Sequence, residues 1–511
     1  MKKKLILFLI LLVSGVLLFP QVLSAADSGE ELTIALGVDP DNLDPSRSVT
    51  SPGSMMALHM TETLFEMSPA GEIEPLLAED YQVAENGQEY EIYLREGIEF
   101  QDGSYFDAEA VKYNLERIQK EEGPNAFLIE KVSEIEVVDD YTLMLRTEEP
   151  FAPLISNLSN QAISILSPEA LETKGEDISS RPVGTGPFEL EEWNRGEEVI
   201  MTRNEDYWGE NARLDRLTFE IVPEGSSRVI MVETGEADAI MGVPPRDRDR
   251  LSSNPDIDVL EVPSLRMMFA GFNTQQPPFD DPRVRRALNY AVDNEAIVEQ
   301  IMDGAGIPAD APISPNVFGH AEQEMYDYDP EKAEKLLTEA GYEEGFSLEL
   351  YHPSGRYMMD ETIAQALQNQ LAEVGVEVEL VTMEFTTLLE TIAQAPEDAE
   401  HDMYLLGYSA ATGDADYFLY ALFHTSQRAP QGNNFSYLEA ENLDNLLEAA
   451  RATADLDQRQ DLYAEINQLI WREAPWIFLH SEVQLNAVRE GVKGLIHHPQ
   501  EYISAKDAYF E

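Results

Sequence analysis

The chain lacks cysteine altogether, although it is 511 residues long. This absence excludes disulfides, thiolate nucleophiles, structural zinc bound through sulfur, and iron–sulfur clusters. Positive charge is also scarce, because 34 lysines and arginines stand against 97 acidic residues, a formal net charge of −63. Contacts to phosphates need clustered lysine and arginine, so we expect no nucleic-acid partner and no binding to an anionic membrane surface.

Long apolar stretches are confined to the N-terminus. Residues 2–4 are lysines, a mainly apolar run covers 5–18, and small residues follow at Ser24, Ala25 and Ala26. This pattern is typical of a secretory signal peptide, which we place at residues 1–26, with cleavage near Ala25 or Ala26. An uncleaved membrane anchor is the alternative, but the run is short for one. No cysteine stands at the cut for lipid attachment, so the pattern predicts export to a periplasm.

The excess of negative charge predicts a stability that depends on salt. Like charges on one compact molecule repel each other and destabilise it, and the screening length falls to about 3 Å at 1 M salt. We therefore interpret the acidic surface as an adaptation to salt and not as a binding feature. The urea midpoint of unfolding is expected to rise from dilute buffer to molar salt, and a flat or falling midpoint would contradict this interpretation.

Strand patterns and helix signals alternate along the rest of the chain. Alternating apolar and polar side chains predict strands at 32–36, 90–94, 141–145 and 217–221, and a hairpin turn at Asp139-Asp140. Capping Asp-Pro pairs predict helix starts at Asp281 and Asp329, and a helix over 361–374 is followed by Gly375 and a strand at 376–380. Repeated helix–strand units predict an α/β fold, and the length predicts two or three lobes.

One motif half-matches a hydrolase. The run GYSAA at residues 407–411 follows an apolar strand and resembles the Gly-x-Ser-x-Gly turn that presents a nucleophilic serine. Ala411 replaces the second glycine, and no helix pattern follows directly. A secreted serine hydrolase that uses Ser409 is therefore an alternative from a different functional class.

Metal and cofactor motifs are incomplete. No His-Glu-x-x-His is present, and His497-His498 stands between glycine and proline, which predicts a surface turn. The pairs Asp39/Asp41 and Asp414/Asp416 do not continue with the ligand spacing of a calcium loop. We expect no catalytic residue, no metal and no cofactor, and we favour a binding protein over an enzyme.

Several runs, in order along the chain, resemble family 5 extracellular solute-binding proteins, the peptide- and nickel-type receptors of ABC importers. They are LREGIEFQDG (94–103), DAEAV (107–111), VGTGPF (183–188), YWG (207–209), GEAD (235–238), FNT (272–274) and PFDDPRVRRA (278–287). The resemblance implies two lobes that close over a ligand like a hinged trap. It also implies lobe I at 27–60, 180–268 and 485–511, a small inserted domain at 61–179, and lobe II at 269–484.

Two further runs are similar to the glutathione-binding subgroup: GYSAATGDADY (407–417) and IWREAPWI (470–477). In the dipeptide-type branch, an aspartate that binds the peptide amine aligns near Ala411, where this sequence departs from the pattern. Asp414 or Asp416 is the candidate for that role here, and capping of the loop or a solvated position is an equal alternative for both. Arg356 lies close to the position of the carboxylate-binding residue, and an arginine fork suits a carboxylate. The same resemblance suggests that Tyr408 and Trp476 line the cleft, although core packing is an equal alternative for both.

The resemblance implies a substrate-binding component of an ABC importer that captures a small peptide. Glutathione or another γ-glutamyl, di- or oligopeptide is the expected cargo, and permease subunits in the inner membrane are the expected partners of a monomeric protein. An oligosaccharide or a nickel complex is the alternative cargo on the same fold.

Overall fold

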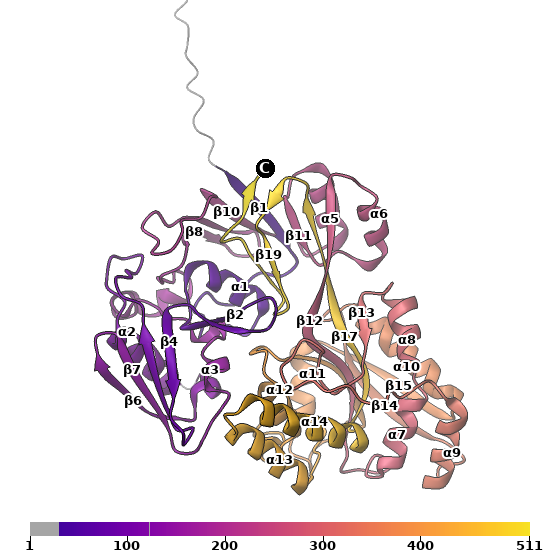
Figure 1. Ribbon diagram of the computed structural model, residues 1–511. Coiled ribbons are helices and arrows are strands. Elements are labelled where there is room, and N and C mark those ends of the chain that lie inside the picture. Colours follow the sequence, from indigo (N-terminus) through magenta and orange to yellow (C-terminus); the bar gives the residue numbers. More distant parts are fainter. Residues whose placement is uncertain (1–29, 122) are drawn as a thin grey trace, which may run out of the picture.

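Two long strands connect the two halves of the molecule (Figure 1). The computed structural model describes residues 30–121 and 123–511, so the predicted signal peptide lies outside the described residues. Strands β12 (Ile257–Phe272) and β17 (Trp476–Arg489) pair antiparallel along most of their length. They form the middle of a sheet with the order β15-β14-β16-β12-β17-β11-β1-β10-β9-β8, and β13 also pairs with β17. These two strands therefore cross between the two α/β lobes.

Lobe I holds one end of this sheet. Its elements are β1 (Glu31–Leu36), α1 (Ser51–Met60), β8 (Phe188–Asn194), β9 (Glu198–Arg203), β10 (Arg216–Ile221), α5 (Gly225–Thr234), β11 (Ala239–Met241) and α6 (Arg248–Ser252). The C-terminal segment returns to this lobe as β18 (Val492–Lys493), β19 (Ile496–His498), β20 (Tyr502–Ser504) and β21 (Tyr509–Phe510). The backbone N–H of Ala505 donates to His59 of α1 at 3.0 Å, which ties the end of the chain to the first helix.

A separate antiparallel sheet follows α1 in the sequence. It consists of β4 (Ala78–Val83), β5 (Glu89–Leu94), β7 (Thr142–Thr147) and β6 (Val132–Asp139), beside α2 (Ala108–Glu121), β2 (Phe65–Met67), β3 (Ile73–Pro75), α3 (Leu154–Asn157) and α4 (Pro168–Lys174). The predicted hairpin is confirmed, since Val137 pairs with Leu143. The buried cluster of this unit runs from Leu64 to Ile165, inside the predicted insertion, while the domain bounds themselves stay a prediction.

Lobe II carries the longer helices. Its elements are α7 (Pro282–Tyr290), α8 (Asn294–Ala296), β13 (Gly306–Pro308), α9 (Pro330–Ala340), β14 (Phe346–Pro353), α10 (Asp360–Glu373), β15 (Val376–Met383), α11 (Phe385–Ile392), β16 (Met403–Ser409), α12 (Ala415–Phe423), α13 (Glu441–Ala452) and α14 (Leu456–Glu473). Both predicted starts are confirmed, because the carboxylates of Asp281 and Asp329 accept from the backbone N–H groups of Arg283 and Lys332.

Two local predictions differ from the structure. His497 and His498 are not in a surface turn but in β19, which pairs with β20, and the buried ring of His498 stacks on Tyr502 at 4.4 Å. In addition, the helix α12 begins at Ala415, soon after the serine motif, where no helix pattern was expected. Its side chains are apolar on most sides, which hides the usual one-faced helical spacing.

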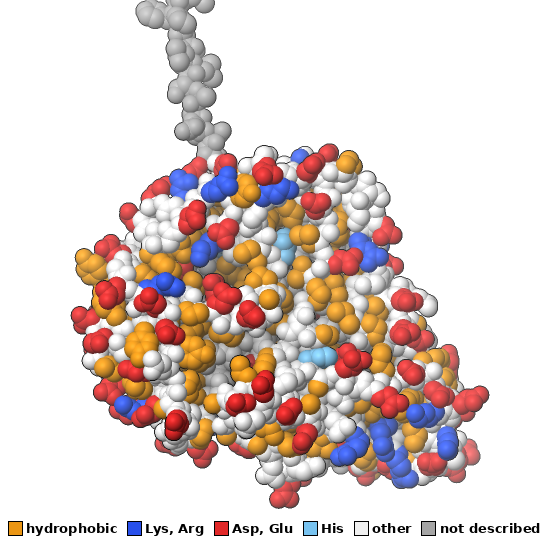
Figure 2. Space-filling view, viewed as in Figure 1, with side chains coloured by type: hydrophobic (Ala, Val, Ile, Leu, Met, Phe, Trp, Pro, Cys, Tyr) orange, Lys and Arg blue, Asp and Glu red, His pale blue; other side chains and the backbone are white. Residues whose placement is uncertain are grey.

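The exposed surface agrees with the charge count. Figure 2 shows acidic side chains spread over the visible face, with few basic ones between them. Across residues 30–121 and 123–511, no helix has both the length and the apolar character needed to cross a membrane.

The fully buried His480 on β17 predicts a pH dependence of stability. Burial lowers the pKa of His480 to about 3, whereas an unfolded histidine titrates near ~6.5. Between these values the unfolded chain binds a proton that the folded chain does not, so stability is lost as the pH falls through this window. The free energy of unfolding of the His480→Leu variant should therefore fall less steeply on acidification than that of the wild type. The two slopes should differ by up to about 1.4 kcal/mol per pH unit. Urea unfolding at pH 7, 6, 5 and 4 measures this, and equal slopes would contradict it.

Candidate ligand pocket between the lobes

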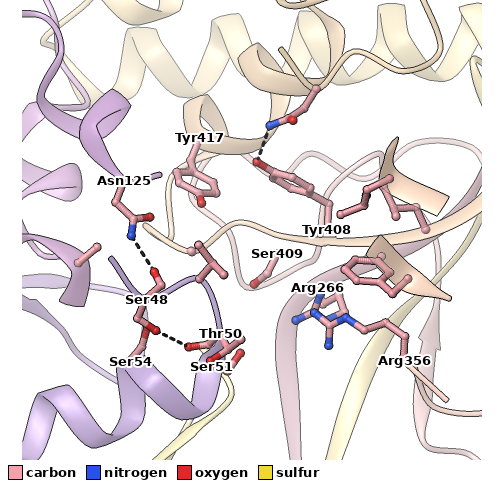
Figure 3. Close-up of a pocket in the computed structure, with 18 of the residues that line it drawn as sticks. Ser48, Thr50, Ser51, Ser54, Asn125, Arg266, Arg356, Tyr408, Ser409 and Tyr417 are labelled. Atoms are coloured by element: carbon pink, nitrogen blue, oxygen red, sulfur yellow. Dashed lines mark hydrogen bonds between the residues drawn. The ribbon is translucent and has the colours of Figure 1, made fainter. Parts of the chain in front are cut away.

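A cavity of about 690 Å³ lies between the two lobes (Figure 3). One side of the pocket is formed by lobe I, the inserted unit and the C-terminal segment. Its lining residues are 48–51, Ser54, Asn125, 160–162, Gln500 and Tyr502. The other side comes from β12 and lobe II, with Arg266, Arg356, Tyr357, Phe385, Leu389, Glu390, Ala393, 406–409, Ala411, Tyr417, 430–433 and Phe435. The volume is in the range of small-molecule sites, which is roughly 300–1,000 Å³.

The wall from lobe I is a loop held against the start of α1. The carboxylate of Asp41 accepts from the hydroxyls of Ser48 at 2.8 Å and Thr50 at 2.6 Å, and Thr50 in turn caps α1. The amide of Asn125 donates to the carbonyl of Ser48 at 2.8 Å. Figure 3 shows Ser51 and Ser54 on this wall, opposite the two arginines. These bonds fix a hydroxyl-rich surface before any ligand arrives.

Arg266 is a buried cation whose charge is already matched. Its Nε and Nη2 lie 2.8 and 2.5 Å from the two carboxylate oxygens of Glu501, and Nε lies 3.2 Å from Glu482. Burial raises the pKa of Glu482, while the guanidinium outweighs burial at Glu501 and holds the pKa of Glu501 below its usual value. Because Glu501 belongs to the C-terminal segment of lobe I, this cluster joins that lobe to the crossing strands at the pocket floor.

Arg356 presents a second guanidinium to the pocket, and it is exposed. Its guanidinium carbon lies 4.8 Å from the ring centre of Phe385 and 5.2 Å from that of Tyr357. In the part of the chain that the structure describes, no carboxylate forms an ion pair with it. The loop that carries it is held by Asp360, which accepts from the backbone N–H of Arg356 at 2.9 Å. The pocket therefore offers a positioned guanidinium that has no salt-bridge partner among the described residues, although its charge also lowers the pKa values of Glu482 and Glu501.

Tyr408 also lines the pocket, beside Tyr417. Its hydroxyl accepts a hydrogen bond from the amide of Asn433 at 3.4 Å, and the two tyrosine rings lie 6.1 Å apart. Burial raises the pKa of the Tyr408 hydroxyl, so it stays protonated and able to donate. Aromatic faces with polar ends can contact both apolar and polar parts of a ligand.

Asp414 and Asp416 lie outside the residues that line the pocket. Asp414 is bound by Arg459 at 2.5 and 2.8 Å, and both side chains are at most 7% exposed. Asp416 lies 3.0 Å from Arg451, and burial raises the pKa of Asp416 to about 6. The expected role of either aspartate in binding a ligand amine is untested, but both carboxylates already have arginine partners.

Trp476 is buried in lobe II and is likewise outside the pocket lining. Its ring stacks on Phe269 at 3.5 Å, and its indole N–H donates to Ser436 at 3.1 Å. Trp476 therefore packs in the core of lobe II, which is the alternative that the sequence left open for it. Ser409 does line the pocket, at the end of β16, but none of the described lining residues is a histidine that could serve as its base.

Comparison with known proteins identifies the family. Residues 72–430 match a family model described as "Bacterial extracellular solute-binding proteins, family 5 Middle". The chain belongs to this family. The glutathione-binding protein GsiB of Salmonella paratyphi A is 32% identical over 501 residues, which cover 97% of this chain and 97% of that protein.

Solved structures of family 5 proteins share the fold. The periplasmic binding protein DppA from Helicobacter pylori, solved with the peptide STSA, has a TM-score of 0.81 at 27% identity and covers 94% of this chain and 98% of its own. The dipeptide-binding protein from Pseudoalteromonas sp. SM9913, solved with Met-Leu, has a TM-score of 0.82 at 26% identity, covering 94% and 100%. The predicted family and two-lobed fold are confirmed.

Sequence reasoning about this family 5 chain missed half of the pocket. Arg266 comes from the crossing strand, and the hydroxyl wall comes from a loop more than 200 residues earlier in the chain. No local motif marks either. The backbone of Ala411 also contributes to the site, because its carbonyl accepts from the side-chain amides of Asn160 at 3.3 Å and Gln500 at 2.6 Å, two contacts that cross the pocket.

Proposed function

We propose that this chain is the substrate-binding component of an ABC importer and that it captures a small peptide in the pocket between its lobes. Glutathione or another γ-glutamyl, di- or oligopeptide is the proposed cargo. The observation that carries the proposal is the exposed guanidinium of Arg356, which lines that pocket and has no salt-bridge partner among the described residues. A peptide ends in a carboxylate, and arginine can bind a carboxylate through two parallel hydrogen bonds.

The names of the relatives support a peptide cargo. GsiB is named for glutathione, and the two solved relatives hold STSA and Met-Leu. We further propose that the protein is a monomer, is exported to the periplasm after cleavage near Ala25 or Ala26, and delivers its cargo to permease subunits in the inner membrane.

An oligosaccharide is the second candidate, because the pocket also carries features that suit a sugar. Tyr408 and Tyr417 offer aromatic faces, and Asn160, Gln161 and Asn433 offer amides for hydroxyl groups. An uncharged sugar would not need Arg356, so the two candidates differ in their dependence on that residue.

A thermal-shift screen of the mature protein tests the proposal. Glutathione, Met-Leu, trialanine, a neutral oligosaccharide and a nickel–histidine complex are compared at equal concentrations. Ligands that bind only the folded state raise the melting temperature. We expect shifts with one or more of the peptides, and a shift with the sugar or the nickel complex alone would contradict the proposed cargo.

A further inference from the structure

A peptide with a free amino end needs a partner for its ammonium group as well as for its carboxylate, because an unpaired charge in a closed cleft is costly. Of the described residues that line the pocket, only Glu390 carries a carboxylate. We propose that Glu390 on α11 receives the ammonium end of the cargo. This inference rests on the proposed function and adds a second charged contact to it.

The carboxylate of Glu390 is available for such a contact. The residue is exposed, and in the described part of the chain its side chain has neither an ion pair nor a hydrogen bond. Only its backbone carbonyl is engaged, by the amide of Gln394 at 2.6 Å. A free carboxylate at the edge of a binding pocket can be paired by a ligand without breaking an existing contact.

Four acids that do not line the pocket already have arginine partners. Glu501 and Glu482 share the guanidinium of Arg266. Asp414 and Asp416 have Arg459 and Arg451. A ligand ammonium would have to displace an arginine from any of these four, whereas Glu390 requires no displacement.

The helix α11 carries residues beside both proposed charged contacts. Phe385, Leu389, Glu390 and Ala393 all line the pocket, so one face of α11 runs along it. The guanidinium of Arg356 lies 4.8 Å from the ring of Phe385, at the start of that helix. Glu390 follows five residues later, about 7.5 Å along the axis at 1.5 Å per residue.

The stretch of α11 that lines the pocket is comparable in length to a short peptide. An extended peptide advances about 3.3–3.6 Å per residue, so two or three residues cover the length of α11 from Phe385 to Glu390. We therefore infer that the pocket takes a short zwitterionic peptide laid along α11, with its carboxylate at Arg356 and its ammonium at Glu390.

Calorimetric titration of Glu390→Gln tests this inference, since glutamine keeps the shape and removes the charge. The probes are glutathione, Met-Leu and trialanine, each also in its N-acetyl form, which carries no ammonium. We expect Glu390→Gln to weaken the free-amine peptides by roughly 5- to 30-fold, between the effects of an exposed and a buried ion pair. The affinities of the N-acetyl forms for the variant and for the wild type should agree within about twofold.

Glu397→Gln is the matched control. Glu397 is exposed in the loop after α11 and does not line the pocket, so its loss should leave all affinities unchanged. If Glu390→Gln changes both forms equally or neither, this inference is overturned, while the proposed function stands if the wild type still binds the peptides through Arg356. If the wild type binds none of the probes, both proposals are overturned.

Discussion

Replacing Asp414 with asparagine is expected to lower the free energy of unfolding by about 3–5 kcal/mol, the usual cost of leaving one partner of a buried ion pair uncompensated. The partner left behind is Arg459, whose side chain is 2% exposed. Asparagine keeps the cap on α12, because its side-chain oxygen can still accept from the backbone N–H of Asp416. The loss therefore reports the ion pair, and urea unfolding monitored by circular dichroism measures it.

A second variant separates this ion pair from other effects. The double replacement of Asp414 by asparagine and Arg459 by methionine removes both charges and should be less destabilised than the two single variants added together. If Asp414→Asn costs less than about 1 kcal/mol, below the range for a buried pair, and instead weakens peptide binding, the carboxylate serves the ligand. In that case Asp414 would bind the ligand amine, as the sequence predicts.

Replacing Arg356 with alanine is expected to weaken peptide binding by about 30-fold or more, which corresponds to at least ~2 kcal/mol. The reason is that the peptide carboxylate would be left in the closed pocket without its charged donor. Arg356→Lys keeps the charge but cannot form the two parallel hydrogen bonds of a guanidinium. Its affinity for peptides should therefore lie between those of the wild type and of Arg356→Ala. Calorimetry with glutathione and Met-Leu provides the affinities.

Arg472→Ala is the control for a general loss of positive charge, because Arg472 is an exposed arginine of α14 outside the pocket. It should bind peptides like the wild type. Normal binding by Arg356→Ala would mean that the carboxylate is held elsewhere or that the cargo has none, and the oligosaccharide candidate would then be favoured.

Much of the fold could be predicted because its signals are local. The Asp-Pro starts at 281 and 329 place a capping carboxylate next to a residue that suits the first helical turn, and both helices begin there. Gly341 ends α9 with φ at 93°, a conformation that glycine adopts readily. The helix α12 was missed because its mostly apolar side chains give no one-faced pattern.

The site was only partly predictable because charge partners are set by tertiary structure. Arg356 and Tyr408 do line the pocket. Asp414 looked equally available, but Arg459, 45 residues later in the chain, binds it. The sequence spacing of Asp414 and Arg459 does not predict that they form an ion pair. Glu390 was not singled out, since one more acid among 97 carries no signal until the pocket is seen.

The most direct test of the central claim is a calorimetric titration of glutathione into the mature protein. The account predicts saturable binding with one peptide per chain, and competition from Met-Leu or trialanine at the same pocket. No binding of glutathione or of either competitor, together with binding of a neutral oligosaccharide, would contradict it.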